Sequence, residues 1–290
     1  MGRVVYSAPG RAGIVGNPSD MYGGSVVSCS IRERAYVSVE PSDRLLLESD
    51  QGVVEVRSRA DLLLRGDHAD ILRAVVAHAY TADLKCHLKC WSEIPFGAGL
   101  SGSTAMVVAA LAALHHFLGL KPNRYHFAEL ARSIELHHLK VVCGYQDQYM
   151  ATFGGLNYMD FRDKEFYREV FSEPYASVES LLPYTDGPPP VILAHTGVKH
   201  NSGAVHKPIR ERWLEGERAV IEAYIRVARL ARLIGDDVAF LIHETGFPPV
   251  PPDDVSHIIP GVALREIAQL AKRKFRRFTV CDRAELPGVS

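Results

Sequence analysis

The stretch PFGAGLSGSTAMVVAALAAL, residues 95–114, sets three glycines and three hydroxyl side chains directly before an apolar run. The glycines allow close approach of the backbone to a ligand, and the run from about 103 to 118 predicts a helix. A helix start exposes unpaired N–H groups and a partial positive charge, which stabilise an anion such as phosphate. The stretch therefore predicts a nucleotide-phosphate loop. It is not a P-loop, since no GK[ST] follows, and a plain glycine turn with a serine cap is the structural alternative.

Composition indicates a globular chain with a small-molecule partner. The 290 residues are 47% hydrophobic and 23% charged, enough for a full core and typical of two domains. Net charge is −1, and Lys and Arg are spread along the chain. This distribution removes the usual electrostatic reason to expect nucleic-acid binding.

Cysteine usage and the start of the chain favour the cytoplasm. The five cysteines form no repeated CxxC pair and leave an odd count, so neither a disulfide framework nor a zinc site is indicated. The start MGRVVYSAPG lacks the continuous apolar segment of a signal peptide, and no stretch of about 18 uncharged apolar residues follows. We expect no membrane partner, and the sequence leaves a homodimer open.

Short β-branched segments at 3–8, 25–31, 35–41, 44–49 and 53–58 predict an antiparallel sheet. Beyond them the pattern predicts helices at 67–83, 103–118, 124–140, 207–234 and 262–275, and strands at 86–95, 191–197 and 278–282. KPN before residue 124 supplies a turn and an N-cap. The Pro-rich segment PYTDGPPP, 183–190, is the predicted domain boundary.

Three segments, in order, resemble the signatures of the GHMP kinase superfamily, which includes the galactokinases, homoserine kinases, mevalonate kinases and phosphomevalonate kinases. PFGAGLSGSTA resembles the second signature, whose usual form is PxGxGLGSSA. APGRAGIVGNPSDMYGG, 8–24, resembles the first signature, and GYQDQYMATFGG, 144–155, resembles the segment that carries the catalytic aspartate.

The resemblance implies an α+β fold in two domains. Residues 1–185 would form the N-terminal GHMP kinase domain, of the ribosomal-protein-S5-domain-2-like type, which carries the ATP and sugar motifs. Residues 186–290 would form a ferredoxin-like C-terminal domain. A third, glycine-rich signature near the C-terminus is missing from the sequence, so we expect this domain to be incomplete, atypical or shortened after about residue 235.

The resemblance also assigns the parts of phosphoryl transfer, which needs positioning, a metal and a group that acts on the acceptor hydroxyl. Asp147 matches the catalytic base, and Arg11, where several relatives carry lysine, would pair with it or with the transferring charge. Ser103 and Glu135 match the Mg²⁺ ligands. The residues expected at the ATP phosphates are Pro95, Gly97, Ala98, Gly99, Leu100, Ser101, Gly102, Ser103 and Thr104.

The string GNPSDMYGG, 16–24, resembles that of the glucuronokinases more than the GEHTDYNGG of galactokinases. It implies an ATP- and Mg²⁺-dependent kinase that phosphorylates the anomeric hydroxyl of a sugar acid, D-glucuronate, to give glucuronate 1-phosphate. The expected substrate residues are Asn17, Ser19, Asp20, Tyr22, Gly144, Tyr145, His200, Ser202, His206 and Arg210. Two alternatives stay open: a heptose-phosphate or neutral-sugar kinase, and a non-catalytic sugar- or nucleotide-binding homologue, which the missing signature favours.

Trp213 and the arginines near it have alternative interpretations. Trp213 is expected to pack in the core rather than stack on a sugar. Arg210 and Arg212 are basic side chains that would suit an acidic sugar, and exposed helix charges would have the same pattern.

Overall fold

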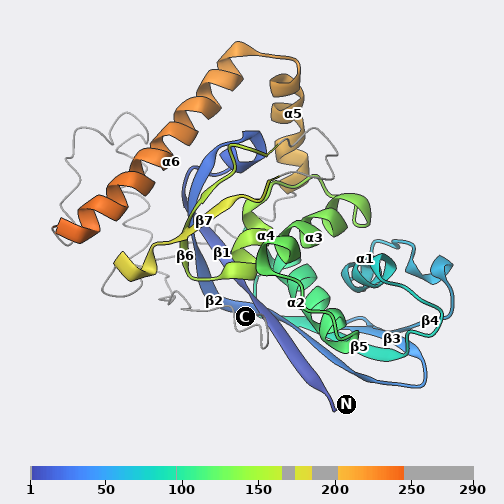
Figure 1. Ribbon diagram of the computed structural model, residues 1–290. Coiled ribbons are helices and arrows are strands. Elements are labelled where there is room, and N and C mark those ends of the chain that lie inside the picture. Colours follow the sequence, from blue (N-terminus) through green and yellow to red (C-terminus); the bar gives the residue numbers. More distant parts are fainter. Residues whose placement is uncertain (1, 96, 165–173, 185–201, 245–290) are drawn as a thin grey trace, which may run out of the picture.

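The computed structural model describes residues 2–95, 97–164, 174–184 and 202–244. It has seven strands in one sheet and helices that pack against it (Figure 1). The strands are β1 (Val4–Val15), β2 (Ser25–Pro41), β3 (Leu45–Ser49), β4 (Gly52–Val56), β5 (Cys86–Ser92), β6 (Leu156–Asp160) and β7 (Ser177–Ser180). The α+β class is therefore confirmed.

The sheet is mixed rather than antiparallel throughout. Its order is β4-β3-β5-β2-β6-β7, and β1 pairs with β2 as well. The pairing of β3 with β5 is parallel, while the other pairs are antiparallel. The segments predicted to pair antiparallel do so where they pair with one another, as β1 with β2 and β3 with β4. The parallel neighbour of β3 is β5, and helix α1 (Asp70–His78), which lies between β4 and β5 in the chain, allows the crossover that this pairing needs.

Strand β2 is continuous where the sequence predicted two strands. The polar residues 32–34 looked like a break, but β2 passes through them because Arg34 is paired across the sheet. Its Nε donates to Ser7 Oγ at 2.9 Å and its Nη2 to the Ser7 carbonyl at 3.1 Å. The two halves of β2 then pair with different strands, residues 25–29 with β6 and residues 35–41 with β5.

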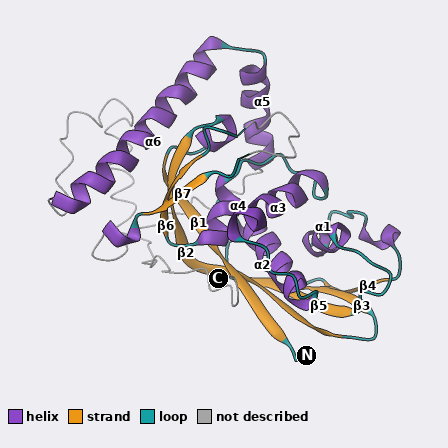
Figure 2. Ribbon diagram, in the orientation of Figure 1, coloured by secondary structure: helices purple, strands orange, loops and turns teal. Residues whose placement is uncertain are grey.

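The helical layer is built around α2 (Gly102–Phe117), with α1, α3 (Arg124–His137) and α4 (Gln146–Phe153) beside it (Figure 2). Residues 105–114 of α2 are all buried, as expected for a helix that is apolar on every side. The predicted cap of α3 is confirmed, since Asn123 Oδ1 accepts from the His126 amide at 2.8 Å. The short helix α4, bounded by Gly144 and Gly154, was not predicted as a helix.

The predicted helix 207–234 is in fact two helices, α5 (Ser202–Leu214) and α6 (Arg218–Glu244). They separate at Gly216, whose φ of +80° suits glycine and ends a helix. The salt bridge between Arg212 and Glu217 closes this turn at 2.5 Å. Helix α6 packs against β2 and the 3-10 helix η1 (Ser19–Tyr22).

Other expectations fall on residues outside the described ranges. These are most of the segment 183–190, the strands at 191–197 and 278–282, and the helix at 262–275, so the domain boundary and the ferredoxin-like domain stay predictions. Among the described residues, no helix is long and apolar enough to cross a membrane.

Candidate active site

The predicted phosphate loop lies at the start of α2 and against β1. Gly97 and Gly99 have φ values of +69° and +72°, which glycine adopts without strain. Leu100 accepts a hydrogen bond from the Arg11 amide at 3.0 Å, and a Cβ on Gly10 would lie 2.9 Å from the same carbonyl. The glycine of the first signature therefore lets the two signatures touch through their backbones.

Ser101 caps α2 in an unusual backbone conformation. Its φ of +58° lies in the left-handed region, which costs a residue with a Cβ about 1 kcal/mol. Its Oγ is buried, and no described residue bonds to it. A strained cap with an unpaired hydroxyl at a helix N-terminus is suited to an anion.

Arg11 and Asp147 form an ion pair beside this loop. The guanidinium Nε lies 2.7 Å and Nη2 2.6 Å from Asp147 Oδ1. Arg11 Nη1 also donates to the Gly99 carbonyl at 3.2 Å. The pairing expected for these two residues is thus present, and one arginine joins the first signature, the phosphate loop and the aspartate segment.

Asp147 lies in the first turn of α4, where the helix dipole stabilises a carboxylate. Both contacts with Arg11 use Oδ1, and no described residue bonds to Oδ2. The Asp147 side chain is 31% exposed. Its second oxygen is therefore available to an acceptor hydroxyl.

Asp20 holds the start of α4 from the first signature. Its Oδ2 accepts from the Tyr145 amide at 2.8 Å and from the Gln146 amide at 3.0 Å. Burial raises the pKa of Asp20, the two amide bonds oppose that rise, and the Asp147 charge adds to it. A Cβ on Gly144 would lie 2.0 Å from Asp20 Oδ2, so only glycine fits there.

Arg132 also fixes the turn before α4. Its Nε donates to the Gly144 carbonyl at 3.0 Å, and its guanidinium lies 3.7 Å from the centre of the Tyr145 ring. Gln146 Nε2 donates to Ser28 Oγ on β2. The segment that carries Asp147 is therefore anchored on both sides of its helix start.

Glu135 is buried between three helices. Its Oε1 accepts from Thr104 Oγ1 of α2 at 2.8 Å, and its Oε2 accepts from Gln148 Nε2 of α4. Burial raises the pKa of Glu135 to about 7, the bonds from Thr104 and Gln148 oppose the rise, and the Asp147 charge adds to it. The hydroxyl next to Glu135 is thus that of Thr104, whereas we expected Ser103, which is exposed.

The donor chemistry around Glu135 fits Mg²⁺. The cation prefers oxygen ligands and is usually held by one or two carboxylates together with substrate phosphates. Glu135 offers one carboxylate, the hydroxyl beside it is that of Thr104, and Ser103 is exposed at the start of α2. The described residues contain no group of three His, Cys, Asp or Glu that could hold a metal. A buried carboxylate whose ionised form is destabilised by Asp147 gains from a cation nearby.

The predicted sugar residues differ in how they are placed. Asn17 is exposed, and Tyr22 is partly buried between two other rings, at 5.2 Å from Trp213 and 4.2 Å from Tyr224 between centroids. Burial raises the pKa of Tyr22, and the positive charge of the nearby Arg210 opposes this rise. Trp213 packs on an aromatic neighbour, but it is partly exposed and lines a pocket rather than lying in the core, where we expected it.

Ser19 and Tyr145 do not suit side-chain contact with a sugar. Ser19 is fully buried, and its Oγ donates to the Ser25 carbonyl at 2.9 Å, which closes the turn. Tyr145 is 1% exposed and packs on Phe161 and Arg132. Their physical role is to shape the backbone around Asp20. His200 lies outside the described residues, as do the side chains of Ser202 and His206.

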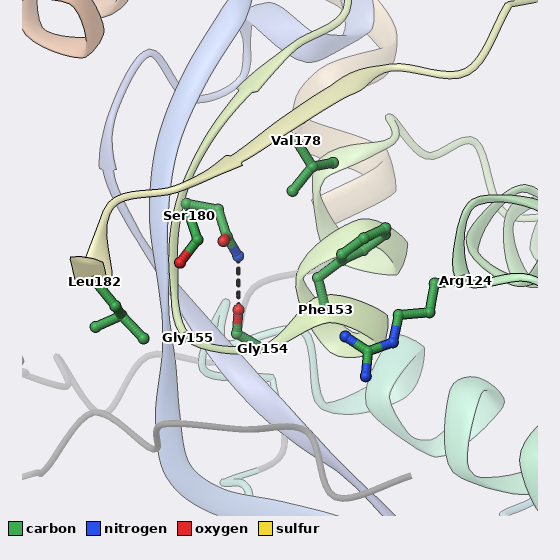
Figure 3. Close-up of a pocket in the computed structure, with 8 residues that line it drawn as sticks. Arg124, Phe153, Gly154, Gly155, Val178, Ser180 and Leu182 are labelled. Atoms are coloured by element: carbon green, nitrogen blue, oxygen red, sulfur yellow. Dashed lines mark hydrogen bonds between the residues drawn. The ribbon is translucent and has the colours of Figure 1, made fainter. Parts of the chain in front are cut away.

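Two pockets lie near these elements. A mostly apolar pocket of about 490 Å³ borders the aromatic cluster and is lined by Tyr22, Gly23, Trp213, Ile221, Tyr224, Ile225, Ala228, Arg229 and Arg232. A pocket of about 240 Å³ lies at the other end of α4 from Asp147, between Arg124 and Phe153 on one side and Ser180 and Leu182 on the other (Figure 3). Asn157 and Gly154 also line this pocket, and Asn157 Nδ2 donates to the Gly154 carbonyl at 2.6 Å.

Sequence reasoning missed the two residues that hold Glu135. Thr104 was assigned to the phosphate loop, and Gln148 was not among the predicted site residues. Thr104 is a polar residue at the start of an apolar helical run, which is a signal for a buried hydrogen-bond partner, whereas Gln148 follows Gln146 and Asp147 in a polar segment that gives no such signal.

Comparison with known proteins identifies the family. Residues 69–155 match the model of the GHMP kinases N terminal domain. The chain is 32% identical over 248 residues to glucuronokinase 1 of Arabidopsis thaliana, which covers 76% of this chain and 65% of that protein. The chain thus spans somewhat less than two thirds of that relative's length.

Solved structures share the fold. A galactokinase from Lactococcus lactis, in complex with galactose, superposes with a TM-score of 0.66 at 15% identity and covers 82% of this chain and 70% of that one. A D-glycero-D-manno-heptose 1-phosphate kinase from Bacteroides thetaiotaomicron gives a TM-score of 0.61 at 20% identity and covers 97% of both chains. Residues 69–155 therefore form a GHMP kinases N terminal domain, and the solved structures show that the chain shares the fold of these kinases.

Proposed function

We propose that the protein is an ATP- and Mg²⁺-dependent sugar kinase that phosphorylates the anomeric hydroxyl of a sugar acid, D-glucuronate, and releases glucuronate 1-phosphate and ADP. The observation that carries the proposal is the ion pair of Arg11 and Asp147 beside the glycine loop. Arg11 and Asp147 are 136 residues apart in the sequence, and their contact brings a cation and a carboxylate together beside the loop proposed to hold the ATP phosphates.

Asp147 would act on the acceptor. Because Arg11 occupies Oδ1, the acceptor hydroxyl would donate to Oδ2, which orients its oxygen toward the phosphorus and receives its proton during transfer. Arg11 holds the carboxylate in place, and as a fixed cation it would stabilise the negative charge that develops on the transferring group.

The loop at 97–104 would hold the ATP phosphates through backbone N–H groups and the N-terminus of α2. Ser103 and Glu135 would hold Mg²⁺, which when bound neutralises phosphate charge. Pro95, Ala98 and Leu100 shape this loop rather than offer side-chain donors. Only the backbone of these three residues is proposed to face the nucleotide.

Asp20 and Tyr22 would form the sugar wall. Asp20 Oδ2 is taken by the two amides of α4, so its Oδ1, to which no described residue bonds, is the oxygen proposed to accept from sugar hydroxyls. Arg210 near Tyr22 supplies a positive charge that suits the carboxylate of a sugar acid. The similarity to glucuronokinase 1 supports glucuronate as the acceptor to test first. The cysteine pattern supports a cytoplasmic location, and a homodimer is the assembly to test.

The test is a coupled ADP-release assay with ATP, Mg²⁺ and a panel of acceptors: glucuronate, galactose, mannose and a heptose phosphate. We expect ADP release that depends on glucuronate and disappears when Mg²⁺ is chelated. If only another acceptor supported ADP release, that acceptor would replace glucuronate as the proposed substrate, and the proposed kinase activity would stand. No release above the chelated control with any acceptor, despite sugar binding by calorimetry, would favour a non-catalytic homologue.

A further inference from the structure

Both oxygens of the Glu135 carboxylate are held by neutral donors inside the protein. Thr104 Oγ1 donates to Oε1 at 2.8 Å, and Gln148 Nε2 donates to Oε2. The three side chains are 5%, 3% and 0% exposed for Thr104, Glu135 and Gln148. The contacts join α2, α3 and α4, so one carboxylate links the phosphate-loop helix to the helix that carries Asp147.

The position of Thr104 departs from the usual form of the signature. In PxGxGLGSSA, counted from Pro95, the ninth position is Ser103 and the tenth, an alanine, is Thr104 in this chain. The chain therefore carries an extra hydroxyl directly after the serine that matches a Mg²⁺ ligand. That hydroxyl does not hydrogen-bond to the backbone of its own helix; it donates to Glu135 of α3.

We propose that Thr104 is a positioning residue for Mg²⁺ binding, whose hydroxyl fixes the carboxylate of Glu135. The inference rests on the proposed function, since Glu135 is assigned to Mg²⁺ there. The hydroxyl of Thr104, the amide of Gln148 and the thiol of Cys143 orient the carboxylate without neutralising its charge, and the carboxylate's remaining lone pairs are left for a cation. Partners of this kind commonly set metal affinity even though they do not touch the metal.

The variant that tests it is Thr104→Val, which keeps the branched shape and removes the hydroxyl. Thr104→Ser keeps the hydroxyl and removes the methyl group. The matched control is Thr152→Val, the same substitution at a buried threonine of α4 whose Oγ1 bonds to no described residue. All four proteins, wild type included, are titrated with ADP by calorimetry, once with Mg²⁺ and once with a chelator, and their melting temperatures are measured.

We expect Thr104→Val to weaken binding of Mg²⁺-ADP about tenfold, within the range seen when such partners of metal ligands are removed. Binding of ADP without Mg²⁺ should stay at the wild-type value, because the backbone of the loop is unchanged. Thr104→Ser should bind Mg²⁺-ADP within about threefold of wild type, and Thr152→Val should match wild type.

The inference is overturned if Thr104→Val binds Mg²⁺-ADP as wild type does, or if it weakens ADP binding equally with and without Mg²⁺, which would indicate a general loss of structure. Loss of Mg²⁺-dependent ADP binding in the wild type would overturn the inference and the Mg²⁺ part of the proposed function together. A protein that turns over no acceptor, but shows the Mg²⁺-specific loss in Thr104→Val, would retain the inference while the proposed kinase activity fails.

Discussion

Arg11 and Asp147 come from the first strand and from α4, and the two nitrogens Nε and Nη2 of the arginine both meet the single oxygen Oδ1 of the aspartate, at 2.7 and 2.6 Å. This one-sided pairing divides the carboxylate between two tasks. Oδ1 is bonded to the guanidinium of Arg11, which also contacts the glycine loop, and Oδ2 is the oxygen proposed to accept from the acceptor hydroxyl.

Asp147→Asn should abolish phosphoryl transfer because an amide cannot accept the proton of the acceptor hydroxyl. General-base removal typically costs about 10²–10⁴ in rate, and ADP binding should stay nearly unchanged. The coupled ADP-release assay measures the first effect and calorimetry the second. Equal turnover in the variant would refute the role of Asp147.

Arg11→Lys should lower kcat about tenfold, and Arg11→Met about 10²–10³, as expected for loss of an electrostatic contact to the transition state. Lysine keeps the charge but has one nitrogen in place of the three that reach Asp147 and Gly99. Steady-state kinetics with saturating ATP gives both values. If Arg11→Met were as active as Arg11→Lys, the charge would not matter to transfer.

Gly144→Ala should displace Asp20, because the new methyl group would lie 2.0 Å from its Oδ2. We expect a loss of about 1–3 kcal/mol in the free energy of unfolding and a raised KM for the acceptor. Denaturant unfolding and kinetics measure these quantities. Gly2→Ala, at an open position, is the control and should change neither; an unchanged KM in Gly144→Ala would argue that Asp20 does not contact the sugar.

His115 should make the fold sensitive to mild acid. Burial lowers the pKa of His115 to about 4, and the charges of His78 and His126 add to that effect. In the unfolded chain this histidine has a pKa near 6.5, so between about pH 6.5 and pH 4 the unfolded state binds a proton that the folded state does not. The free energy of unfolding is therefore unaffected by His115 above about pH 6.5 and decreases as the pH falls toward 4.

Between pH 7.5 and pH 5, this one histidine should cost the wild type about 2 kcal/mol of unfolding free energy that His115→Leu does not lose. Denaturant unfolding at the two pH values measures the difference. Because His78 and His126 interact with His115, the difference between the two proteins includes their coupling to it. Parallel pH profiles for the two proteins would show that His115 is protonated in the folded state.

The sequence predicted those features that depend on local chemistry. The apolar run at 105–114, the asparagine before α3 and the pairing of Arg11 with Asp147 all follow from residue types at short or signature-defined spacing. The separation of α5 from α6 carried a usable signal as well, because Gly216 stands between two polar residues where a helix commonly ends.

Features that depend on distant partners were missed. Residues 32–34 looked like a turn until Ser7 of the neighbouring strand paired with Arg34, and the parallel neighbour of β3 is decided by a crossover rather than by either strand. Thr104 was read as a loop hydroxyl because its partner, Glu135, lies 31 residues away. In each case the deciding contact joins segments that no local pattern relates.

Strand β2 is one continuous strand that pairs with β6 along its first half and with β5 along its second half. Strand β1 pairs with both halves of β2. Neither half of the sheet can then open without pulling on the other. The amides of β2, and those of β1 that bond to β2, should exchange with deuterated solvent together, at the rate of global unfolding rather than of local fluctuation. A destabilising substitution at either end of the sheet would accordingly reduce the amount of folded protein, and would not leave a half-folded chain with one working end.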